Sequence, residues 1–344
     1  MSARESIIPV FVPHLGCPND CVFCNQRRIS GSTVPASSDD VDKAIEAAAA
    51  LPRTGAKRQL AFYGGSFTAI PVPQQTALLA AAKRHLDAGE IDAVRLSTRP
   101  DAIDGAILAR LREYGVETIE LGAQSMCDEV LALSGRGHTA ADVENASRMI
   151  RAADFRLILQ MMTGLPGDTA QRCEQTARRI IEFAPDGVRI YPTVIVRDTA
   201  LYDLWQEGRY KEHTVENAVE YCARIVPLFE RAGIPIIRLG LNPTEELSGG
   251  AAAGGAYHPA LGELVRSRIM RDRAETLLTE ADAAPQSAVT LGVSPAKLSQ
   301  MIGQHRRNID WLTARFQLKS LKIRPMELPD GEITVLSVEK SEEI

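Results

Sequence analysis

The chain has 344 residues, of which 45% are apolar and 24% are charged, and its formal net charge is −5. This composition is typical of a globular protein with one large core and a small additional part, and the acidic net charge argues against a protein that binds nucleic acid over its whole surface. The N-terminal residues lack the apolar stretch of a signal peptide, and no apolar run is long enough to span a bilayer. We therefore expect a cytoplasmic protein without a membrane segment.

Strand-like apolar runs alternate with amphipathic, helix-like stretches over the first 240 residues. The predicted strands cover residues 8–12, 59–63, 93–98, 118–122, 156–162, 188–192 and 234–239, and the helices between them include residues 73–86, 105–114, 140–153, 170–183 and 215–232. Such alternation predicts right-handed crossovers and a parallel sheet with helices outside it. Six or seven such units predict an α/β fold that closes into a full or partial (β/α) barrel, in which functional residues collect on the loops after the strand C-termini.

Three cysteines directly after the first predicted strand, Cys17, Cys21 and Cys24, have the spacing C-x3-C-x2-C. Three thiolates in so short a loop can bind one metal centre. A closed zinc site needs a fourth ligand, whereas a four-iron cluster held by three cysteines keeps one iron position open. The remaining cysteines, Cys127, Cys173 and Cys222, are scattered along the chain, and we expect them to pack as small apolar side chains.

A glycine pair follows the second predicted strand, in the run Gly64-Gly65-Ser66-Phe67-Thr68. Glycines let the backbone approach a ligand because no Cβ intervenes, although an isolated pair would indicate only a tight turn. Behind the cysteine motif, this loop resembles that of radical S-adenosylmethionine (radical SAM) enzymes. The resemblance implies a 4Fe-4S cluster on Cys17, Cys21 and Cys24, which cleaves S-adenosylmethionine reductively to methionine and a 5′-deoxyadenosyl radical. It also implies that residues 64–68, including Ser66 and Thr68, receive the amino group of S-adenosylmethionine.

Further motifs narrow the resemblance to the radical domain of the Elongator catalytic subunit family, over roughly residues 5–270. They lie at residues 64–68, 97–101, 120–125, 136–139, 164–167, 190–193 and 201–205. The resemblance implies that Gln124 and Ser125 face the cosubstrate, that Arg136 meets its carboxylate, and that backbone near residues 194–196 contacts the adenine. We expect residues 272–344 to be too few for the acetyltransferase domain of that family.

Residues 241–285 form the predicted connection to the last part of the chain. Residues 241–261 are rich in Gly and Ala and predict a flexible loop. A loop of this length inside a compact domain is typical of a lid over a functional site. His258 could meet a substrate as an acid or base, or cap the helix that begins near Leu261. That helix extends to about residue 283, and we expect its arginines, Arg266, Arg268, Arg271 and Arg273, to lie mostly on a solvated face.

Residues 286–344 predict a small basic α+β module, because residues 286–325 hold seven basic residues and one acidic residue. The predicted elements are a strand at 288–293, helices at 294–302 and 307–316, and strands at 320–324 and 332–338. This order is similar to a KH nucleic-acid-binding module, whose GXXG loop clamps a sugar-phosphate backbone. The chain keeps Gly303 but has Arg306 at the second glycine position. The nucleic-acid candidates are Gly303, Arg306, Arg307, Lys319 and Lys322, and the alternative is a basic structural cap.

We therefore divide the chain into a radical SAM barrel (1–240), a loop and connecting helix (241–285) and a KH-like module (286–344). The favoured function is a radical SAM enzyme that modifies an RNA base, with tRNA as the expected RNA, and that receives electrons from a reductant protein such as flavodoxin or ferredoxin. The alternatives are a radical SAM enzyme on a small molecule such as a tetrapyrrole, similar to coproporphyrinogen oxidase, and a non-catalytic RNA-binding metalloprotein. The basic module argues against the tetrapyrrole alternative, because a porphyrin substrate gives it no evident role. Gly64, Gly65 and Arg136 argue against the non-catalytic alternative, because a structural metal site does not need a cosubstrate pocket.

Overall fold

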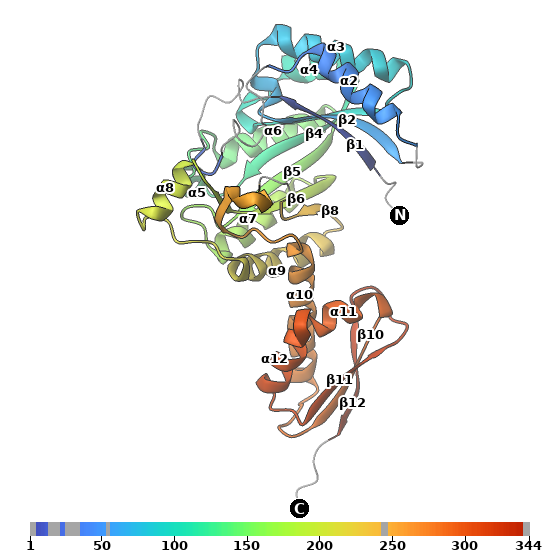
Figure 1. Cartoon of the computed structure of the whole chain (residues 1–344), viewed down its shortest axis with the longest axis vertical. Helices are drawn as coiled ribbons and strands as arrows, with labels where there is room; N and C mark the ends of the chain where they lie inside the picture. Colours follow the sequence, from blue (N-terminus) through green and yellow to red (C-terminus); the bar gives the residue numbers. More distant parts are fainter. Residues whose placement is uncertain (1–4, 13–20, 25–34, 53–55, 242–246, 340–344) are drawn as a thin grey trace, which may run out of the picture. The chain divides into compact units, whose positions relative to one another are not determined.

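The computed structural model describes residues 5–12, 21–24, 35–52, 56–241 and 247–339 (Figure 1). The chain forms two compact units. The first comprises residues 1–214 and 225–257, and the second comprises residues 215–224 and 258–344. The helix predicted at 261–283 therefore lies in the same unit as the C-terminal module.

The first unit is built on a sheet of seven parallel strands in the order β1-β2-β3-β4-β5-β6-β8. Their bounds are β1 Glu5–Val12, β2 Lys57–Gly64, β3 Ala93–Thr98, β4 Val116–Gln124, β5 Arg156–Thr163, β6 Gly187–Pro192 and β8 Ile236–Leu239. Every neighbouring pair is parallel, and the strands curl into a half-barrel with helices outside (Figure 1). All seven predicted strands are present, and the predicted fold class is confirmed.

Helices connect these strands as the amphipathic stretches predicted. They are α3 Val72–Asp87, α4 Gly105–Glu113, α6 Ala140–Ala152, α7 Ala170–Glu182 and α9 Val215–Arg231, together with three that the sequence analysis omitted: α2 Ser38–Ala49, α5 Asp128–Leu133 and α8 Ala200–Gln206. Thr139 and Thr169 accept a backbone N–H at the start of α6 and α7, which satisfies first-turn donors. None of the helices in the described ranges is both long and apolar enough to cross a membrane.

The two faces of the curled sheet differ in chemistry because successive side chains of a strand point to opposite sides. On β4, Ile119 and Leu121 are fully buried and apolar, while Thr118 and Glu120 alternate with them. Burying a Leu or Ile side chain contributes about 1.5–3 kcal/mol, so the apolar face holds the helices against the sheet. The opposite face carries polar and charged side chains into the half-barrel.

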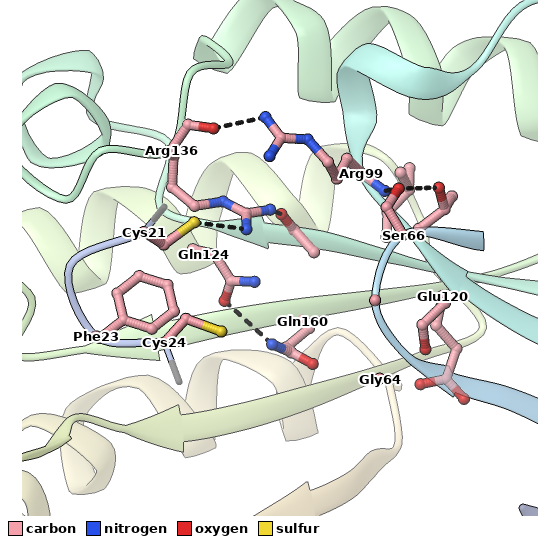
Figure 2. A pocket seen from close by; sticks show the side chains of 15 residues that line it. Cys21, Phe23, Cys24, Gly64, Ser66, Arg99, Glu120, Gln124, Arg136 and Gln160 are labelled. Atoms are coloured by element: carbon pink, nitrogen blue, oxygen red, sulfur yellow. Dashed lines mark hydrogen bonds between the residues drawn. The ribbon is translucent and has the colours of Figure 1, made fainter. Parts of the chain in front are cut away.

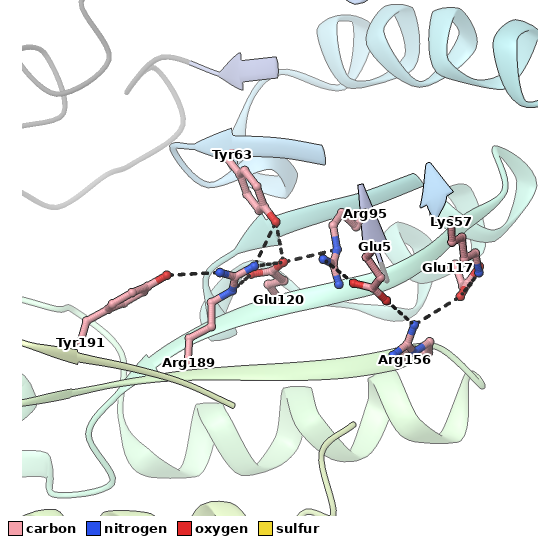
Figure 3. Close-up of polar contacts among 9 residues, drawn as sticks. All are labelled: Glu5, Lys57, Tyr63, Arg95, Glu117, Glu120, Arg156, Arg189 and Tyr191. Carbon is pink, nitrogen blue, oxygen red and sulfur yellow. Dashed lines mark hydrogen bonds and ion pairs between the residues drawn. The ribbon is translucent and has the colours of Figure 1, made fainter. Parts of the chain in front are cut away.

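A buried ion-pair network fills the inner face (Figure 3). The Glu120 carboxylate accepts hydrogen bonds from the Tyr63 hydroxyl at 2.8 Å and from Arg189 Nε at 2.8 Å. Arg95 Nε lies 3.4 Å from the same carboxylate. Arg95 also pairs with Glu5 at 3.4 Å. Burial and the charge of Glu120 raise the pKa of Tyr63 above its usual value. Burial is the largest influence on Arg189 and would lower its pKa, but the charge and hydrogen bond of Glu120 together with the nearby Tyr191 and Tyr63 raise the pKa overall. Both groups therefore keep their protons at neutral pH.

The loop predicted at 241–261 contains a strand, so its description as loop throughout was wrong. Strand β9 (Ala252–Gly255) pairs antiparallel with β7 (Val194–Val196), with Ile195 opposite Gly254. A Cβ on Gly255 would lie 2.8 Å from the Thr193 carbonyl oxygen and 2.9 Å from Ile195 N. Small residues are therefore required there for backbone contact rather than for flexibility.

The second unit is an α+β module around a three-stranded sheet in the order β11-β10-β12. Its elements are α10 Leu261–Glu280, β10 Ala288–Val293, α11 Leu298–Ile302, α12 Arg307–Arg315, β11 Ser320–Pro325 and β12 Ile333–Glu339. Strand β10 pairs parallel with β11 and antiparallel with β12, and the core includes Leu278, Leu291, Met301 and Leu312. The predicted order of helices and strands is confirmed.

Replacing Gly164 by Ala should destabilise the first unit. Gly164 has a φ of +77°, and a Cβ there would lie 2.0 Å from Cγ of the buried His213 ring. The left-handed backbone and this overlap together should cost about 3 kcal/mol. Urea unfolding of Gly164→Ala should show a lower midpoint than the wild type.

Gly208→Ala is the matched control, because Gly208 has a φ of +71° but nothing within 4 Å of the added Cβ. It should lose about 1 kcal/mol, from backbone strain alone. Equal midpoints for the two variants would contradict the contact with His213.

Candidate functional site

A cavity of about 150 Å³ opens at the C-terminal ends of the central strands (Figure 2). Residues from the cysteine loop, the loop after β2, and strands β3, β4 and β5 surround it. They are Cys21, Phe23, Cys24, Gly64, Gly65, Ser66, Ser97, Thr98, Arg99, Glu120, Leu121, Gly122, Gln124, Arg136 and Gln160. This is the edge of a parallel α/β sheet where ligands bind.

Two of the three motif cysteines lie in this cavity, and Cys17 lies outside the described residues. Cys21 and Cys24 belong to one turn, in which Cys24 N donates to the Cys21 carbonyl at 2.9 Å. Between them, the Val22 N–H donates to the Ser134 carbonyl at 3.1 Å, and the Val22 carbonyl accepts from Leu201 N at 2.7 Å. The turn is thus fixed to α5 and α8. The sulfur of Cys21 faces Arg136, and the sulfur of Cys24 lies on the side of Gln124 and Gln160 (Figure 2).

The glycine loop borders the same cavity. Gly64 ends β2 with a φ of 103°, in the region that favours glycine, and Gly65 N donates to the Val12 carbonyl at 2.8 Å. Ser66 Oγ lies 2.9 Å from Thr98 Oγ1 and accepts from Arg99 N at 3.2 Å. Thr68 does not line the cavity; it is buried and bonded to Thr98 and to the Ala102 carbonyl. The two hydroxyl residues therefore connect the glycine loop to the end of β3.

Gln124 reaches the cavity through an irregular end of β4. The pairing with β5 shifts register between Gly122 and Gln124, and Gln124 has a φ of 63°, which is unusual for a non-glycine residue. Its Oε1 accepts from Gln160 Nε2 at 3.2 Å. Ser125 does not line the cavity: its Oγ lies 3.3 Å from Thr176 Oγ1 and accepts from Cys127 N at 3.1 Å. Ser125 therefore supports the strand end from behind.

Arg136 links the cysteine turn to β4. Its Nη2 donates to the Gly122 carbonyl at 2.7 Å, and its Nη1 lies 3.5 Å from Cys21 Sγ. Arg99 Nη2 donates to the Arg136 carbonyl at 2.7 Å, and Arg99 is itself held by Asp101 at 2.8 Å. A buried guanidinium with these fixed contacts places a positive charge beside the sulfur and at the cavity wall.

Eight lining residues were not predicted as site residues: Phe23, Ser97, Thr98, Arg99, Glu120, Leu121, Gly122 and Gln160. Phe23 lies in the cysteine turn, and the others lie on or just after the central strands; the motifs at residues 97–101 and 120–125 contain most of them but do not by themselves indicate which side chains face a cavity. The usable signal was the alternation along β4, which places Glu120, Gly122 and Gln124 on one face. Residues 194–196 of β7, predicted near an adenine, are not in the lining.

The nucleic-acid candidates occupy two places in the second unit. The first place is the turn between α11 and α12, which contains Gly303, Arg306 and Arg307. The second is the edge strand β11: Lys319 directly precedes this strand, Lys322 lies in it, and both are exposed. Arg306 has a φ of 62°, so the chain adopts a glycine-like conformation at the position where the GXXG pattern has its second glycine. His258 Nδ1 accepts from Ala260 N at 3.1 Å just before α10, whose N-cap residue is Ala260 and which has no side-chain cap.

Two family models match the chain. The model of the Radical SAM superfamily matches residues 11–180, and that of the Radical SAM C-terminal domain matches residues 185–271. Human Elongator complex protein 3 is 34% identical over 138 residues, which are 39% of this chain and 25% of that protein. The tRNA uridine(34) acetyltransferase of Methanocaldococcus jannaschii is 31% identical over 145 residues, 40% of this chain and 27% of that protein. The chain thus matches about a quarter of the length of these curated relatives.

Two solved structures share the fold. Elp3 of Methanocaldococcus infernus, with an N-terminal deletion, has a TM-score of 0.61 at 21% identity and covers 79% of this chain and 64% of that chain. Coproporphyrinogen III oxidase (HemN) of Escherichia coli, a radical SAM enzyme, has a TM-score of 0.50 at 19% identity and covers 67% and 53% of the two chains. At these identities the likeness concerns the fold alone.

Acidification should destabilise the first unit through two buried histidines. Burial, assisted by Arg136, lowers the pKa of His138 from 6.5 to about 4, and burial lowers the pKa of His213 from 6.5 to about 4. Because the fold prefers the neutral imidazoles, their stabilisation is complete above pH 6.5 and is lost as the pH falls towards 4. The loss should be on the order of 3 kcal/mol for each imidazole, measured by urea unfolding between pH 7.5 and 4.5.

His213→Gln tests this assignment, since an amide does not titrate in this range but can still bond to Thr163 Oγ1, which lies 3.1 Å from His213 Nε2. The variant should lose less stability than the wild type over the same pH interval. An unchanged dependence on pH would rule out His213 as a source.

Proposed function

Because the chain belongs to the radical SAM superfamily, we propose that Cys17, Cys21 and Cys24 bind a 4Fe-4S cluster and that the adjoining cavity binds S-adenosylmethionine for the modification of an RNA base. The superfamily uses this cluster and this cosubstrate, and the predicted resemblance to the Elongator radical domain is confirmed by the matching relatives. The chain is thus a radical SAM enzyme related to Elongator complex protein 3 and to tRNA uridine acetyltransferases.

The donor set in the described part of the cavity fits an iron–sulfur cluster. Cys21 and Cys24 both line it from one hydrogen-bonded turn, and thiolates are the usual ligands of such clusters. Arg136 Nη1 lies 3.5 Å from Cys21 Sγ, and a guanidinium donor offsets the negative charge of a thiolate ligand. Cys17, the third ligand in this proposal, stands four positions before Cys21 in the sequence.

The remaining polar groups fit a zwitterionic amino acid joined to a ribose. Arg136 offers a guanidinium for a carboxylate, the pairing for which its planar geometry is suited. Gln124 and Gln160 offer amides at the ends of β4 and β5, and Gly64 allows close approach of the β2 end. A cradle of this kind also depends on Gly122, where a Cβ would lie 2.8 Å from Gln124 Nε2 and 3.2 Å from Arg136 Nη2.

A reduced cluster held by the three cysteines would supply the electron for reductive cleavage of S-adenosylmethionine to methionine and a 5′-deoxyadenosyl radical. The chain's own contribution is to bind and orient the cosubstrate between two strand ends and to close the floor of the cavity with Glu120. Tyr63 and Arg189 donate hydrogen bonds to that carboxylate, so the side of the cavity formed by Glu120 is polar. We further propose that a small reductant protein, such as flavodoxin or ferredoxin, delivers the electron.

RNA as the substrate class is supported by the names of the relatives, which include a tRNA uridine(34) acetyltransferase. It is also supported by the basic second unit, where residues 286–325 carry seven basic residues and one acidic residue. Phosphate contacts from such residues position an RNA without reading its sequence. The single observation that carries the proposal is the convergence of the cysteine turn, the glycine loop and Arg136 on one cavity.

The function is tested by anaerobic turnover. The full chain is loaded with iron and sulfide, reduced, and given S-adenosylmethionine with or without total cellular tRNA, and 5′-deoxyadenosine is quantified. We expect the product to form and to increase several-fold with tRNA, because a bound substrate consumes the radical productively. Cys24→Ala should lack both the cluster and the product, whereas Cys127→Ala, which removes a half-buried thiol outside the motif, should keep them.

Two results would contradict this proposal in different ways. An equal yield of 5′-deoxyadenosine with and without tRNA would support the radical chemistry but contradict tRNA as the substrate, and it would favour a small molecule such as a tetrapyrrole. Normal iron content in Cys24→Ala would refute the cluster assignment itself.

Gly122→Ala should weaken binding of S-adenosylmethionine without unfolding the protein. The added Cβ meets the ends of two flexible side chains, Gln124 and Arg136, which can move aside but then leave their binding positions. We expect about a tenfold higher dissociation constant by equilibrium dialysis, as for one displaced charge-assisted hydrogen bond. Gly105→Ala, where nothing lies within 4 Å of the added Cβ, should bind as the wild type; an equal affinity of Gly122→Ala would remove the two side chains from the binding site.

A further inference from the structure

The second unit contains a cavity that the radical chemistry does not use. Its volume is about 350 Å³, and side chains of α10, of the turn between α11 and α12, and of the start of α9 line it. The contributing part of α9, residues 215–224, belongs to the same compact unit. This volume is within the range of small-ligand sites, and the polar lining includes Arg268, Arg271, Gln304, Arg307 and Asn308.

The cavity lining carries three guanidinium groups, and the carboxylates near them are fewer in number. Glu216 is the carboxylate among the described lining residues. Asp272 is shared, because it lies 2.7 Å from Arg268 Nε and 3.3 Å from Arg271 Nη2. Arg307, which is exposed, adds a third guanidinium group to the lining. The cavity therefore keeps an excess of positive charge.

Arg271 is largely buried, so its assignment to a solvated helix face was wrong. Its side chain is 14% exposed, and its guanidinium carbon lies 4.2 Å from the centre of the Trp311 ring. Within the described part of the chain its buried Nε has no hydrogen-bond partner. Burial and the nearby Arg268 lower the pKa of Arg271. A buried donor without an acceptor is costly, and an anion in the cavity would supply the acceptor.

The turn between α11 and α12 holds Arg307 at this cavity. Gly303, His305 and Arg306 have φ values of 76°, 53° and 62°, a conformation that is strained for the two residues that are not glycine. Asn308 is buried, and its Nδ2 donates to the Ser267 carbonyl at 2.8 Å and to the Gln300 carbonyl at 3.1 Å. The nine-residue helix α12 starts here without a side-chain cap, so its positive end adds to the field.

We propose that this cavity binds the phosphate group of one nucleotide in the backbone of the RNA substrate. The planar fork of a guanidinium matches phosphate oxygens in pairs, and Arg271, fixed on Trp311, is preorganised for that contact. The volume accommodates the attached sugar as well as the phosphate. This inference rests on the proposed RNA substrate, and it assigns α10 together with the α11–α12 turn as the phosphate-binding site.

The test measures binding of a short, fluorescein-labelled single-stranded RNA to the reconstituted full chain at a series of KCl concentrations. Arg307→Gln should weaken binding about tenfold and reduce the slope of log affinity against log salt by about one. Arg271→Lys keeps a charge but removes the planar fork, and it should weaken binding while changing the slope little. Arg315→Gln, at the other end of α12 and outside the cavity lining, should bind as the wild type.

Each other result overturns the assignment. Equal losses in Arg307→Gln and Arg315→Gln would indicate a general effect of surface charge, and wild-type binding in Arg307→Gln and Arg271→Lys would remove the cavity from the RNA contact. Binding of AMP or inorganic phosphate that depends on these arginines, without binding of the RNA, would assign the cavity to a small phosphorylated molecule. RNA affinity does not depend on cleavage of S-adenosylmethionine, so failure here and failure of the proposed radical chemistry give separate signals.

Discussion

The half-barrel depends on one buried carboxylate. Glu120 joins strands β2, β3, β4 and β6 because Tyr63, Arg95 and Arg189 all converge on it. A buried charge is tolerated only with close partners, and removing one partner of such a pair costs about 3–5 kcal/mol. The inner face can therefore be polar, as a cavity for a charged ligand requires, while the outer face remains apolar against the helices.

The same network connects the structural interior to the site. Glu120 lines the cavity on one side and contacts Arg95 and Arg189 on the other, so the cavity floor is held in place by ion pairs rather than by loops. The cysteine turn and the glycine loop are in turn tied to strand ends and to α5 by backbone hydrogen bonds. Rigid support of this kind suits a site that must hold a metal centre and a cosubstrate in a fixed relation.

The second unit differs from the half-barrel in how its arginine charges are balanced. In the half-barrel, the buried guanidinium groups of Arg95 and Arg189 pair with carboxylates, whereas around the α10 cavity Arg268 and Arg271 share one carboxylate and Arg307 adds a further positive charge. Buried charge that is balanced by close partners stabilises a framework, whereas charge left in excess around a cavity favours a ligand of opposite sign. The two units thus use the same residue type, arginine, for structure and for the proposed binding of phosphate.

Sequence alone determined the parts that depend on local pattern. The seven strands, the main helices, the cysteine spacing and the glycine loop follow from periodicity and from short motifs, which neighbouring residues specify. Tertiary structure decided which polar side chains meet. Gln160 reaches Gln124, Arg136 reaches Cys21 and β9 pairs with β7 through strand register and loop packing over long separations in the chain. Arg271 was assigned to solvent because helical position does not reveal a neighbour such as Trp311, which a different helix supplies.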